Sequence, residues 1–440
     1  MSQKRINEFL IKNNEDGNSD ITLSKIEWRR VRLGDIVIFK NGINFNSKQK
    51  GNKGILTIDV KNMYTDDIYP DTDKLYRVNI DYKGDYVLKN GDILFVRSSV
   101  KKEGVAWTTT FKEIKEPVTF CGFITRAKLK LNNILPEYIT YFFRSSIARD
   151  NLIDSSSQSV ITNINQNSLS NVLVPLPFSN GQPDLELQQK IVQLIEELFK
   201  KISEMRGLSN KNEINGKKIL LSTISKIFND LKEKEYAIYI LDDIAKTTTG
   251  GTPRRGIEDY WLDGIIPWVK SGELEDNVIF NTEERITQKG LDESNAKIFP
   301  KGSLLIALYG ATVGKMATLG IDACTNQAIC VIFPKDNFNR DFIKYYLYYI
   351  REMLIQRSKN LGGAQPNISQ KLIRSIKIPI PMTNGFPNVK KQKQIVEQLD
   401  YISKRQDLFL DYIANSKISF EKLKQSILHK AFKGELVIEA

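Results

Sequence analysis

The sequence predicts an α+β protein that contains two related mixed α/β domains, each followed by a long helix. The first observation is an internal repeat: the stretch 174–192, VPLPFSNGQPDLELQQKIV, recurs at 378–396 as IPIPMTNGFPNVKKQKQIV, a spacing of 204 residues (378 − 174 = 204). A period this long indicates duplication of a whole domain, because the repeats of solenoid proteins are much shorter. The second observation is a sustained heptad pattern after each copy of the repeat.

The repeat divides the chain into five segments. Residues 28–36 align with 236–244 at a spacing of 208 (236 − 28 = 208), so a shift of four residues accumulates within the domain, which loop insertions explain. The expected segments are an N-terminal arm (1–27), a first domain (28–183), a first helix (184–232), a second domain (233–387) and a second helix with a C-terminal tail (388–440).

Each domain is expected to combine buried strands with short helices. The apolar run Ile93–Val96 follows a Gly-Asp turn and the run 304–308 follows a glycine, which is typical of buried strands. Residues 136–143 begin with a proline, as helices often do, and they match 341–347. The two domains differ most in the loops between these landmarks.

Both copies of the repeat lead into segments with the heptad spacing of a coiled coil. From Asn388 to Lys433 there is no proline or glycine, so one helix of about 70 Å is possible at ~1.5 Å per residue. The first segment turns polar at Ser209 and Asn212 and contains Gly216, which predicts a weaker or kinked helix. The seam residues are Ile191, Ile195, Leu198 and Ile202 in the first segment and Leu399, Ile402, Phe409, Ile413, Phe420 and Leu423 in the second.

The two helical segments are expected to pack against each other as an antiparallel coiled-coil spacer. The domain between them must bridge their ends, which makes an antiparallel pair sterically the easiest arrangement. The alternatives are that each helix covers its own domain or pairs with another subunit. With the antiparallel pair, the fold is two mixed α/β domains related by a pseudo-two-fold repeat and separated by two long helices.

The composition favours a soluble protein with a phosphate-bearing partner. The net charge is +12 and the pI is about 9.2. Lysine and arginine bind nucleic acid by releasing condensed counterions from its phosphates, although a soluble protein can also be simply lysine-rich. No apolar run approaches the ~20 residues needed to span a bilayer, and the N-terminus lacks the apolar core of a signal peptide. With only three cysteines, we expect a cytoplasmic protein without a disulfide framework.

The sequence lacks the patterns of nucleotide-binding and nuclease sites. A P-loop needs four residues between its glycines and a hydroxyl residue after its lysine, but three residues separate Gly310 from Gly314, and Met316 stands in the hydroxyl position. Asp92 with Glu113-x-Lys115 faintly resembles a metal-dependent nuclease pattern. The spacing is loose, and we interpret these residues as surface charge.

Methyl-transfer and metal motifs are also missing from the sequence. There is no Asn-Pro-Pro-Tyr or Asp-Pro-Pro-Tyr motif to hold a flipped base. A single histidine, His429, and the lack of Cys-x-x-Cys make histidine catalysis and a zinc site improbable. The sequence therefore predicts a recognition protein without catalytic residues, metal or cofactor.

Basic, amide and aromatic residues gather in loops of both domains. Arginine suits N7 and O6 of guanine, asparagine and glutamine suit adenine, and lysine and serine mostly reach phosphate. The alternative for each residue is an ordinary solvated loop. The candidate DNA-binding residues are Arg97, Ser98, Lys101 and Lys102 in the first domain and Thr249, Arg254, Arg255, Trp268, Lys270, Ser271, Tyr309, Asn326 and Gln327 in the second.

A set of motifs indicates a family resemblance. In the second half these are Leu-Asp-Asp-Ile244, Thr-Gly-Gly-Thr-Pro253, Tyr-Trp261, Ile-Pro-Trp268-Val-Lys-Ser271, Leu-Tyr-Gly310-Ala-Thr, Thr-Asn-Gln327 and the closing Leu-Lys-Gln-Ser-Ile-Leu428. With them, the chain resembles the specificity (S) subunit of Type I restriction–modification systems, over nearly its whole length after about residue 28. The first half departs from the family pattern: it lacks the Thr-Gly-Gly-Thr-Pro loop, and Phe120-Cys-Gly-Phe123 stands near the position of Thr-Asn-Gln.

The resemblance implies a division of labour between domains and helices. The two domains would be target-recognition domains, each reading one half of a bipartite, asymmetric site in double-stranded DNA. The helices would dock two methyltransferase subunits and set the gap between the half-sites. Those subunits would bring S-adenosylmethionine and adenine-N6 chemistry, and motor-nuclease subunits would join them for restriction. ATP and magnesium are then expected on partner subunits only.

Two other functions remain open. One is a restriction–modification enzyme with its own active site, of which this chain would be the recognition part; the missing methyltransferase and nuclease motifs argue against it. The other is a helical scaffold whose basic charge is incidental. A scaffold predicts no DNA sequence preference and little dependence of DNA binding on salt.

Overall fold

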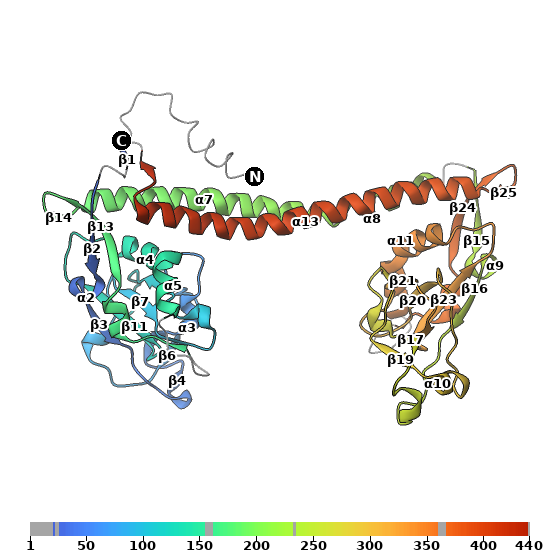
Figure 1. Cartoon of the computed structure of the whole chain (residues 1–440), viewed down its shortest axis with the longest axis horizontal. Helices are drawn as coiled ribbons and strands as arrows, with labels where there is room; N and C mark the ends of the chain where they lie inside the picture. Colours follow the sequence, from blue (N-terminus) through green and yellow to red (C-terminus); the bar gives the residue numbers. More distant parts are fainter. Residues whose placement is uncertain (1–20, 23–25, 155–161, 232–234, 360–366, 439–440) are drawn as a thin grey trace. The chain divides into compact units, whose positions relative to one another are not determined.

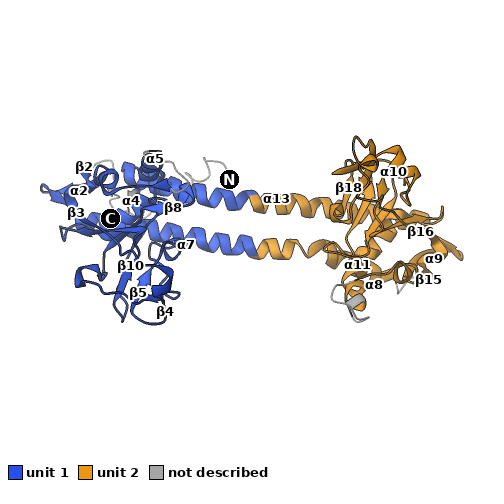
Figure 2. Ribbon diagram, turned by 90° about the horizontal axis from the view of Figure 1, so that it is seen from below, with its two compact units in different colours: residues 1–210, 415–440 blue, residues 211–414 orange. Residues whose placement is uncertain are grey.

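The computed structural model describes residues 21–22, 26–154, 162–231, 235–359 and 367–438 (Figure 1). Most of the expected N-terminal arm lies outside these residues. The chain forms two compact units (Figure 2): unit 1 contains residues 1–210 and 415–440, and unit 2 contains residues 211–414. Each unit therefore includes part of both long helical segments.

Unit 1 is built on an antiparallel sheet with the strand order β3-β11-β7-β9. Its strand β7 (Ile93–Val96) is buried on both faces, which confirms the predicted buried strand. Ile93 and Phe95 pack in one apolar cluster with helix α4 (Pro136–Arg144), whereas Leu94 and Val96 belong to a second cluster, as the two-residue period of a strand requires. The neighbouring strands are β3 (Val37–Asn41), β9 (Thr108–Thr110) and β11 (Ile124–Leu129).

Smaller sheets surround this one. A second sheet has the order β10-β5-β6-β4, and a hairpin sheet has the order β14-β13-β2. These strands are β10 (Val118–Phe120), β5 (Ile55–Ile58), β6 (Tyr76–Val78), β4 (Lys50–Gly51), β14 (Gln182–Pro183), β13 (Leu173–Ser179) and β2 (Glu27–Arg32), with the pairs β8 (Ser98–Ser99) and β12 (Thr162–Asn163), and β1 (Ile21–Thr22) and β26 (Val437–Ile438). The short helices are α2 (Leu33–Ile36), η2 (Ser47–Gln49), α3 (Val60–Met63), η3 (Gly84–Tyr86), η4 (Lys102–Gly104), α5 (Ser146–Asp154) and α6 (Gln166–Ser170).

Unit 2 repeats this architecture and adds a strand to the main sheet. The order there is β16-β23-β20-β21-β18, of which the first four strands correspond to β3-β11-β7-β9. Strand β20 (Leu304–Ala307) confirms the other predicted buried strand and alternates in the same way: Leu304 and Ile306 pack in one cluster with α11 (Arg340–Lys359), and Leu305 and Ala307 pack in another.

The other elements of unit 2 form two further sheets, β19-β17-β22 and β15-β24-β25, with short helices between them. The strands of these two sheets are β15 (Tyr236–Ile240), β17 (Ile266–Val269), β19 (Glu284–Ile286), β22 (Cys324–Thr325), β24 (Lys377–Thr383) and β25 (Phe386–Pro387). The strands of the main sheet besides β20 are β16 (Ala245–Thr249), β18 (Asn277–Ile279), β21 (Met316–Leu319) and β23 (Ile329–Pro334). The short helices are α9 (Leu241–Ile244), η5 (Glu258–Tyr260), η6 (Ser271–Glu273), α10 (Gln288–Asp292) and α12 (Gln370–Arg374).

The hairpin sheets of the two units share one register. Val174 pairs with Val31 across β13 and β2, and Ile378 pairs with Tyr239 across β24 and β15. These partners are separated by the same 204 and 208 residues that the repeat shows in the sequence (378 − 174 and 239 − 31). The sequence repeat is therefore a repeat of strand pairing.

Each hairpin turns tightly at its Asn-Gly pair. The φ angles are 50° and 78° at Asn180 and Gly181, and 50° and 79° at Asn384 and Gly385. Positive φ at both central residues defines the type I′ turn, which Asn-Gly favours and whose twist suits a two-residue hairpin. The turn brings the chain directly to the start of a long helix in both units.

A buried glutamine fixes the start of each long helix. Gln188, in α7 (Leu185–Gly216), accepts the N–H of Leu135 at 2.9 Å. Its Nε2 donates at 3.1 Å to the carbonyl of the residue two positions before Leu135. Gln392, in α13 (Val389–Lys433), accepts the N–H of Asn339 at 2.8 Å. Its Nε2 donates at 3.4 Å to the carbonyl of the residue two positions before Asn339. Both glutamines are completely buried, so each helix is joined to the loop before α4 or α11.

In unit 1 the first part of α7 and the last part of α13 pack antiparallel. Arg206 forms an ion pair with Glu421 (3.3 Å), while Lys424 lies over the ring of Phe199 (5.5 Å), so contact positions rise on one helix as they fall on the other. The seam residues Ile191, Ile195 and Ile202 are buried, and Leu198, Phe420 and Leu423 are partly buried in the same cluster.

In unit 2 the helix α8 (Ile219–Leu231) and the first part of α13 are also antiparallel. The N–H of Leu220 donates to Oε1 of Gln406 (2.9 Å), and a Cβ on Gly216 would lie 2.8 Å from the ring of Phe409. The seam residues Leu399 and Ile413 are buried, Ile402 is partly buried, and Phe409 is 38% exposed.

The helical pair and the break in the first helix confirm the sequence predictions. α7 ends at Gly216 and α8 begins at Ile219, so the first helix is interrupted where its seam turns polar. The predicted fold class is thus confirmed: mixed α/β domains of one architecture and long helices that pair antiparallel within each unit. Among the helices of the described ranges, none combines the length and apolar character that crossing a membrane requires.

The interpretation of Asp92 as surface charge is wrong. Asp92 is 2% exposed, accepts the N–H of Lys89 at 2.9 Å and lies 3.6 Å from the guanidinium of Arg126. Burial raises the pKa of Asp92, because desolvation outweighs these favourable contacts. Glu113 and Lys115 are exposed, so the three residues do not form a common site.

We predict that Gln188→Ala destabilises the protein by about 1–3 kcal/mol, the cost of leaving a buried N–H and carbonyl without partners. The control is Gln193→Ala, since Gln193 is exposed on the same helix. Urea and thermal unfolding measure the difference. Equal stability of the two variants would contradict the structural role given to Gln188.

Candidate nucleic-acid interface

In unit 2 the loops that hold the candidate residues are bonded to one another. Thr252, in the loop after β16, donates its hydroxyl hydrogen to Oε1 of Gln327, in the loop after β22. Thr312, in the loop after β20, donates to the carbonyl of Ser271, the first residue of η6 after β17 (2.6 Å). Loops from two sheets therefore form one continuous surface.

Steric crowding explains why the loop after β16 has glycine at both position 250 and position 251. A Cβ on Gly250 would lie 2.0 Å from the carbonyl oxygen of Thr325, and one on Gly251 would lie 2.3 Å from the backbone of Asn295. Because no larger residue fits, the Gly-Gly pair lets this loop pack directly on its neighbours.

Arg255 lies at the centre of an aromatic and acidic network. Its guanidinium carbon is 3.8 Å from the centre of the Trp261 ring and 4.9 Å from that of Trp268. It also forms an ion pair with Glu284 of β19, and the ammonium of Lys270 lies 3.1 Å from the same carboxylate. Arg255 and Lys270 are therefore held in place by the protein itself.

The carboxylates around this network shift the ionisation of its members. Burial alone would raise the pKa of Glu284, but hydrogen bonds from Arg255 and Lys270 hold it below its ordinary value. The pKa of Lys270 is raised by Glu283, whose carboxylate lies 2.6 Å away, and by Glu284. Lys270 and Glu284 consequently both remain charged near neutral pH.

Trp268 corrects the list of candidate DNA contacts. The residue is only 2% exposed, and its Nε1 donates to the carbonyl of Gly251 at 3.0 Å. Its ring meets that of Trp261 edge-on at 5.0 Å, the geometry that aromatic quadrupoles favour. Trp268 therefore supports the loop after β16 and the side chain of Arg255 from below instead of contacting DNA.

The other candidates of unit 2 surround this network. Arg254 is exposed, and its carbonyl accepts Nε1–H of Trp261 at 3.3 Å. Asn326 is half-buried, with its Oδ1 accepting the N–H of Ala328 at 3.1 Å. Gln327 is exposed, while Thr249, Ser271 and Tyr309 are half-buried. The exposed members Arg254 and Gln327 are the most accessible.

In unit 1 the candidates follow β7. The N–H of Arg97 donates to the carbonyl of Phe123 at 2.9 Å, and Ser98 donates its hydroxyl hydrogen to Asn163 of β12. Lys101 is exposed, and Lys102 is half-buried at the start of η4. The loop borders a groove of about 730 Å³, to which Ser98 and Lys101 contribute.

The loop after β7 is three residues longer than its counterpart in unit 2. Ser98 pairs with Asn163 as Tyr309 pairs with Asn367, which fixes the loop starts. At the loop ends, the N–H of Ala106 donates to Val96 and that of Gly314 donates to Ala307, and both donors have positive φ (59° and 78°). The spans are thus eight residues and five (106 − 98 and 314 − 309).

The amide pair of unit 2 is replaced in unit 1. The N–H of Asn326 donates to the carbonyl of Val269 at the end of β17, and the N–H of Cys121 donates to Ile58 at the end of the equivalent strand β5, both at 3.0 Å. Cys121 and Gly122 therefore occupy the positions of Asn326 and Gln327. The backbone is the same and the side chains differ in chemistry.

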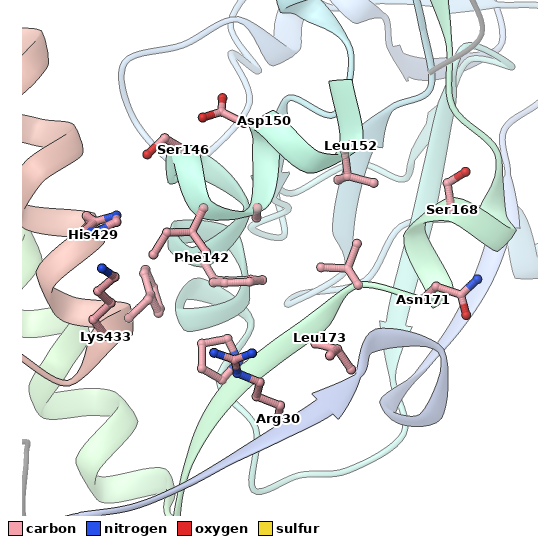
Figure 3. A pocket seen from close by; sticks show the side chains of 15 residues that line it. Arg30, Phe142, Ser146, Asp150, Leu152, Ser168, Asn171, Leu173, His429 and Lys433 are labelled. Atoms are coloured by element: carbon pink, nitrogen blue, oxygen red, sulfur yellow. The ribbon is translucent and has the colours of Figure 1, made fainter. Parts of the chain in front are cut away.

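A hollow of about 900 Å³ lies elsewhere in unit 1 (Figure 3). Arg30 of β2, Asp150 of α5, and His429 and Lys433 of α13 contribute charged or titratable groups around a lining that includes Phe142. None of the candidate DNA-binding residues lines it. Within the described part of the chain there is also no group of three or more histidine, cysteine or acidic residues that could hold a metal ion.

Sequence reasoning missed Glu284, Glu283 and Thr312. The two glutamates stand 29 and 13 residues from the cations they bind, Arg255 and Lys270, and nothing in their local sequence marks them as partners. Trp261 appeared in a motif but had no role; its place over Arg255 follows only from the folded loop.

The fold and these surfaces define a class of protein: a duplicated α+β protein that presents the same loop framework twice, with different side chains, beside paired long helices. The chain belongs to the family described as Type I restriction modification DNA specificity domain, whose model matches residues 25–215 and 233–409.

Two relatives illustrate the sequence similarity. The specificity subunit of the Type I restriction enzyme EcoR124I/EcoR124II of Escherichia coli is 24% identical over 272 residues, which are 61% of this chain and 63% of the relative. The specificity subunit of the Type I restriction enzyme MjaIX of Methanocaldococcus jannaschii is 30% identical over 199 residues, 44% of this chain and 42% of the relative. The alignments thus span less than two thirds of these relatives.

Solved structures share the fold. The HsdS subunit from Thermoanaerobacter tengcongensis is 19% identical with a TM-score of 0.61, and the match covers 93% of this chain and 97% of that one. A chain from a structure on complex assembly and conformational transition of the type I R-M system is also 19% identical, with a TM-score of 0.69 and coverage of 93% and 98%.

We predict that the ion-pair network of Glu284 stabilises unit 2 only above acidic pH. Since its folded pKa is lowered, its contribution is present above the ordinary glutamate pKa of about 4.3 and is lost as the pH falls through the lowered value. The stability difference between the wild type and Glu284→Gln should therefore shrink on acidification. Thermal unfolding between pH 7 and pH 3 measures it, with the exposed Glu258→Gln as control. A constant difference would contradict the ion pair.

Proposed function

We propose that this chain is the DNA-recognition subunit of a Type I restriction–modification complex, and that each unit reads one half of a bipartite site. The observation that carries the proposal is the duplicated loop framework with unlike side chains: Asn326 and Gln327 in unit 2 stand where unit 1 has Cys121 and Gly122. Two units with the same loop framework and different side chains would fit an asymmetric site whose half-sites differ. The family match to both units supports the same function.

In this proposal, unit 2 uses separate residues for base and phosphate contacts. Arg254 is exposed and suits N7 and O6 of guanine, and the amides of Asn326 and Gln327 suit adenine. Thr249 and Ser271 lie at the edge of the same surface and suit phosphate. Arg255 and Lys270 are neutralised by Glu283 and Glu284, so their role in this proposal is to orient the loop that holds Arg254.

The helices are proposed to dock two methyltransferase subunits. Large apolar side chains on their surface support this: Tyr401, Leu408 and Tyr412 of α13 are 61%, 57% and 66% exposed in unit 2, and Leu208 and Ile418 are 63% and 59% exposed in unit 1. Exposed apolar patches of this kind mark protein interfaces.

The chemistry is proposed to reside on the partners. The methyltransferase subunits would bind S-adenosylmethionine and methylate adenine N6, and motor-nuclease subunits would use ATP and magnesium for restriction. This chain would contribute recognition and no catalytic group. A cytoplasmic location belongs to the same proposal, and the buried free thiols of Cys121, Cys324 and Cys330 fit a reducing compartment.

The experiment that tests the proposal is co-expression with the methyltransferase subunit of its own system, followed by mapping of methylated adenines in the host DNA. The expected result is methylation at one bipartite sequence with two different halves. Methylation without a common sequence, or at a continuous site, would show that the chain is not a two-part reader.

We predict that the half-sites respond to substitutions independently. Arg254→Ala should relax or weaken recognition of the second half-site only, by about 1–3 kcal/mol, the usual value of one bidentate base contact. Arg97→Ala should affect the first half-site only. Methylation maps of both variants provide the measurement, and altered recognition of both halves by either change would refute the two-reader arrangement.

We also predict that the helical seam controls assembly or half-site spacing and leaves base preference unchanged. Ile402→Asp places a charge in a partly buried seam position, so it should shift the spacing or release the methyltransferase subunits. Lys404→Asp, on the exposed side of the same helix, is the control. Size-exclusion chromatography of the complex and methylation mapping report the two effects. A changed base preference in Ile402→Asp would contradict this role.

A further inference from the structure

The groove of unit 1 beside the candidate loop has apolar walls. Val100 is 80% exposed, Phe123 is 55% exposed and Tyr64 is 45% exposed, and all three line it together with Trp107. Val100 belongs to the loop that is three residues longer than its counterpart in unit 2. In the register that pairs Ser98 with Tyr309, Val100 corresponds to Ala311, so unit 1 presents the larger apolar side chain.

The wall formed by Trp107 is rigid. Its ring lies 4.1 Å from the guanidinium carbon of Arg144 and 5.0 Å from that of Arg149, and Tyr64 meets it edge-on at 6.3 Å. Arg144 is buried and donates to the carbonyls of Thr108 and two residues of the loop after α3. These contacts hold the Trp107 side of the groove in place.

Polar side chains in and around the groove are bonded to each other. The hydroxyls of Tyr64 and Ser99 are 3.1 Å apart, and Ser98 donates to Asn163. The carboxylate of Asp59 accepts the hydroxyl hydrogen of Tyr76 at 2.7 Å. These groups already have partners within the protein. The groove therefore offers the exposed apolar surfaces of Val100, Phe123 and Tyr64 together with the charged side chains of Lys61, Lys101 and Glu103.

The surroundings of the groove connect it to the proposed DNA surface. Phe123 is bonded through its carbonyl to the N–H of Arg97 at 2.9 Å. Lys61 and Lys101 line the groove and are exposed, as is Glu103, and Asp59 also contributes to the lining. The two lysines can reach phosphates beside a bound base edge. Ser98 and Lys101, two of the candidate DNA-binding residues, line the groove itself, and this continuity favours a DNA base edge over an apolar peptide as the occupant.

Only one group in the major groove of DNA matches an apolar wall. Guanine, adenine and cytosine present hydrogen-bond donors and acceptors there, whereas thymine also presents its C5 methyl group. The position of Asn326 and Gln327 is filled by Cys121 and Gly122 in unit 1, so the amides that suit adenine in unit 2 are replaced.

We infer that unit 1 recognises a thymine of the first half-site by contact of its C5 methyl group with Val100 and Phe123. The inference rests on the proposed function and names the base chemistry of one half-site. Burying a methyl group stabilises a complex by about the transfer free energy of one CH₂ group from water, which corresponds to roughly a fourfold change in affinity.

The test replaces thymines with deoxyuridine, which lacks only the methyl group. In the assembled complex with methyltransferase subunits, each thymine of the mapped half-sites is replaced singly and binding is measured by competition. The expected result is about fourfold weaker binding for one thymine of the first half-site. Val100→Thr, which replaces a methyl by a hydroxyl at nearly constant shape, and Phe123→Ala should each reduce the thymine-to-deoxyuridine ratio toward one.

Ile38→Thr is the matched control, because Ile38 is 59% exposed on β3, paired with Lys128 and remote from the strand end that holds Phe123. It should keep the wild-type ratio. The inference is overturned if no thymine of the first half-site responds, or if the ratio is unchanged in the assembled complexes of Val100→Thr and Phe123→Ala. A complex without any preferred sequence would instead refute the proposed function.

Discussion

A buried glutamine amide at the start of each long helix is the contact on which the rest of the structure depends. Gln188 and Gln392 each bond to a backbone N–H and a carbonyl of a distant loop, in a position with no access to solvent. A buried amide left unpaired costs about 1–3 kcal/mol, so the observed arrangement of the helix start and that loop is favoured over arrangements that break these bonds. The junction of each domain with its long helix is called the joint below. The Asn-Gly turn before the helix and the side chain that caps the helix start also restrict this joint.

This fixed frame allows the loops at the strand ends to differ. The backbone hydrogen bond of Cys121 in unit 1 is equivalent to that of Asn326 in unit 2, and the bond of Ala106 is equivalent to that of Gly314. The side chains of the loops at these positions nevertheless differ between the units. In unit 2 the loop surface is stabilised by Arg255 stacked on Trp261, with Glu284 as its acidic partner. In unit 1 Trp107 between two guanidinium groups has the corresponding supporting role. Recognition can thus change while the strands and the joint remain constant.

The parts that were predictable from sequence depend on local or periodic patterns. The spacing of 204 residues predicted a duplicated domain, and the heptads predicted the long helices and the interruption near Gly216, because apolar periodicity acts within a few residues. The antiparallel direction was expected because the second domain must bridge the helix ends. The partners of Arg255 and Asp92 could not be predicted in this way. Glu284 and Arg126 come from other strands, and the burial of Trp268 depends on its contacts with Gly251 and Trp261 in the segment after β16. Such contacts are set by tertiary packing, for which a single sequence offers no local signal.

The central claim is that each unit is an independent reader attached to its helix by the same joint. The most direct measurement uses a chain in which residues 236–387 are replaced by a second copy of residues 28–183, since both segments begin and end at equivalent positions of the joint. Methylation mapping of its complex should give a site whose two halves are the same sequence, the first half-site of the parent chain. A site that keeps the parent's second half, or a new sequence in both halves, would contradict the claim.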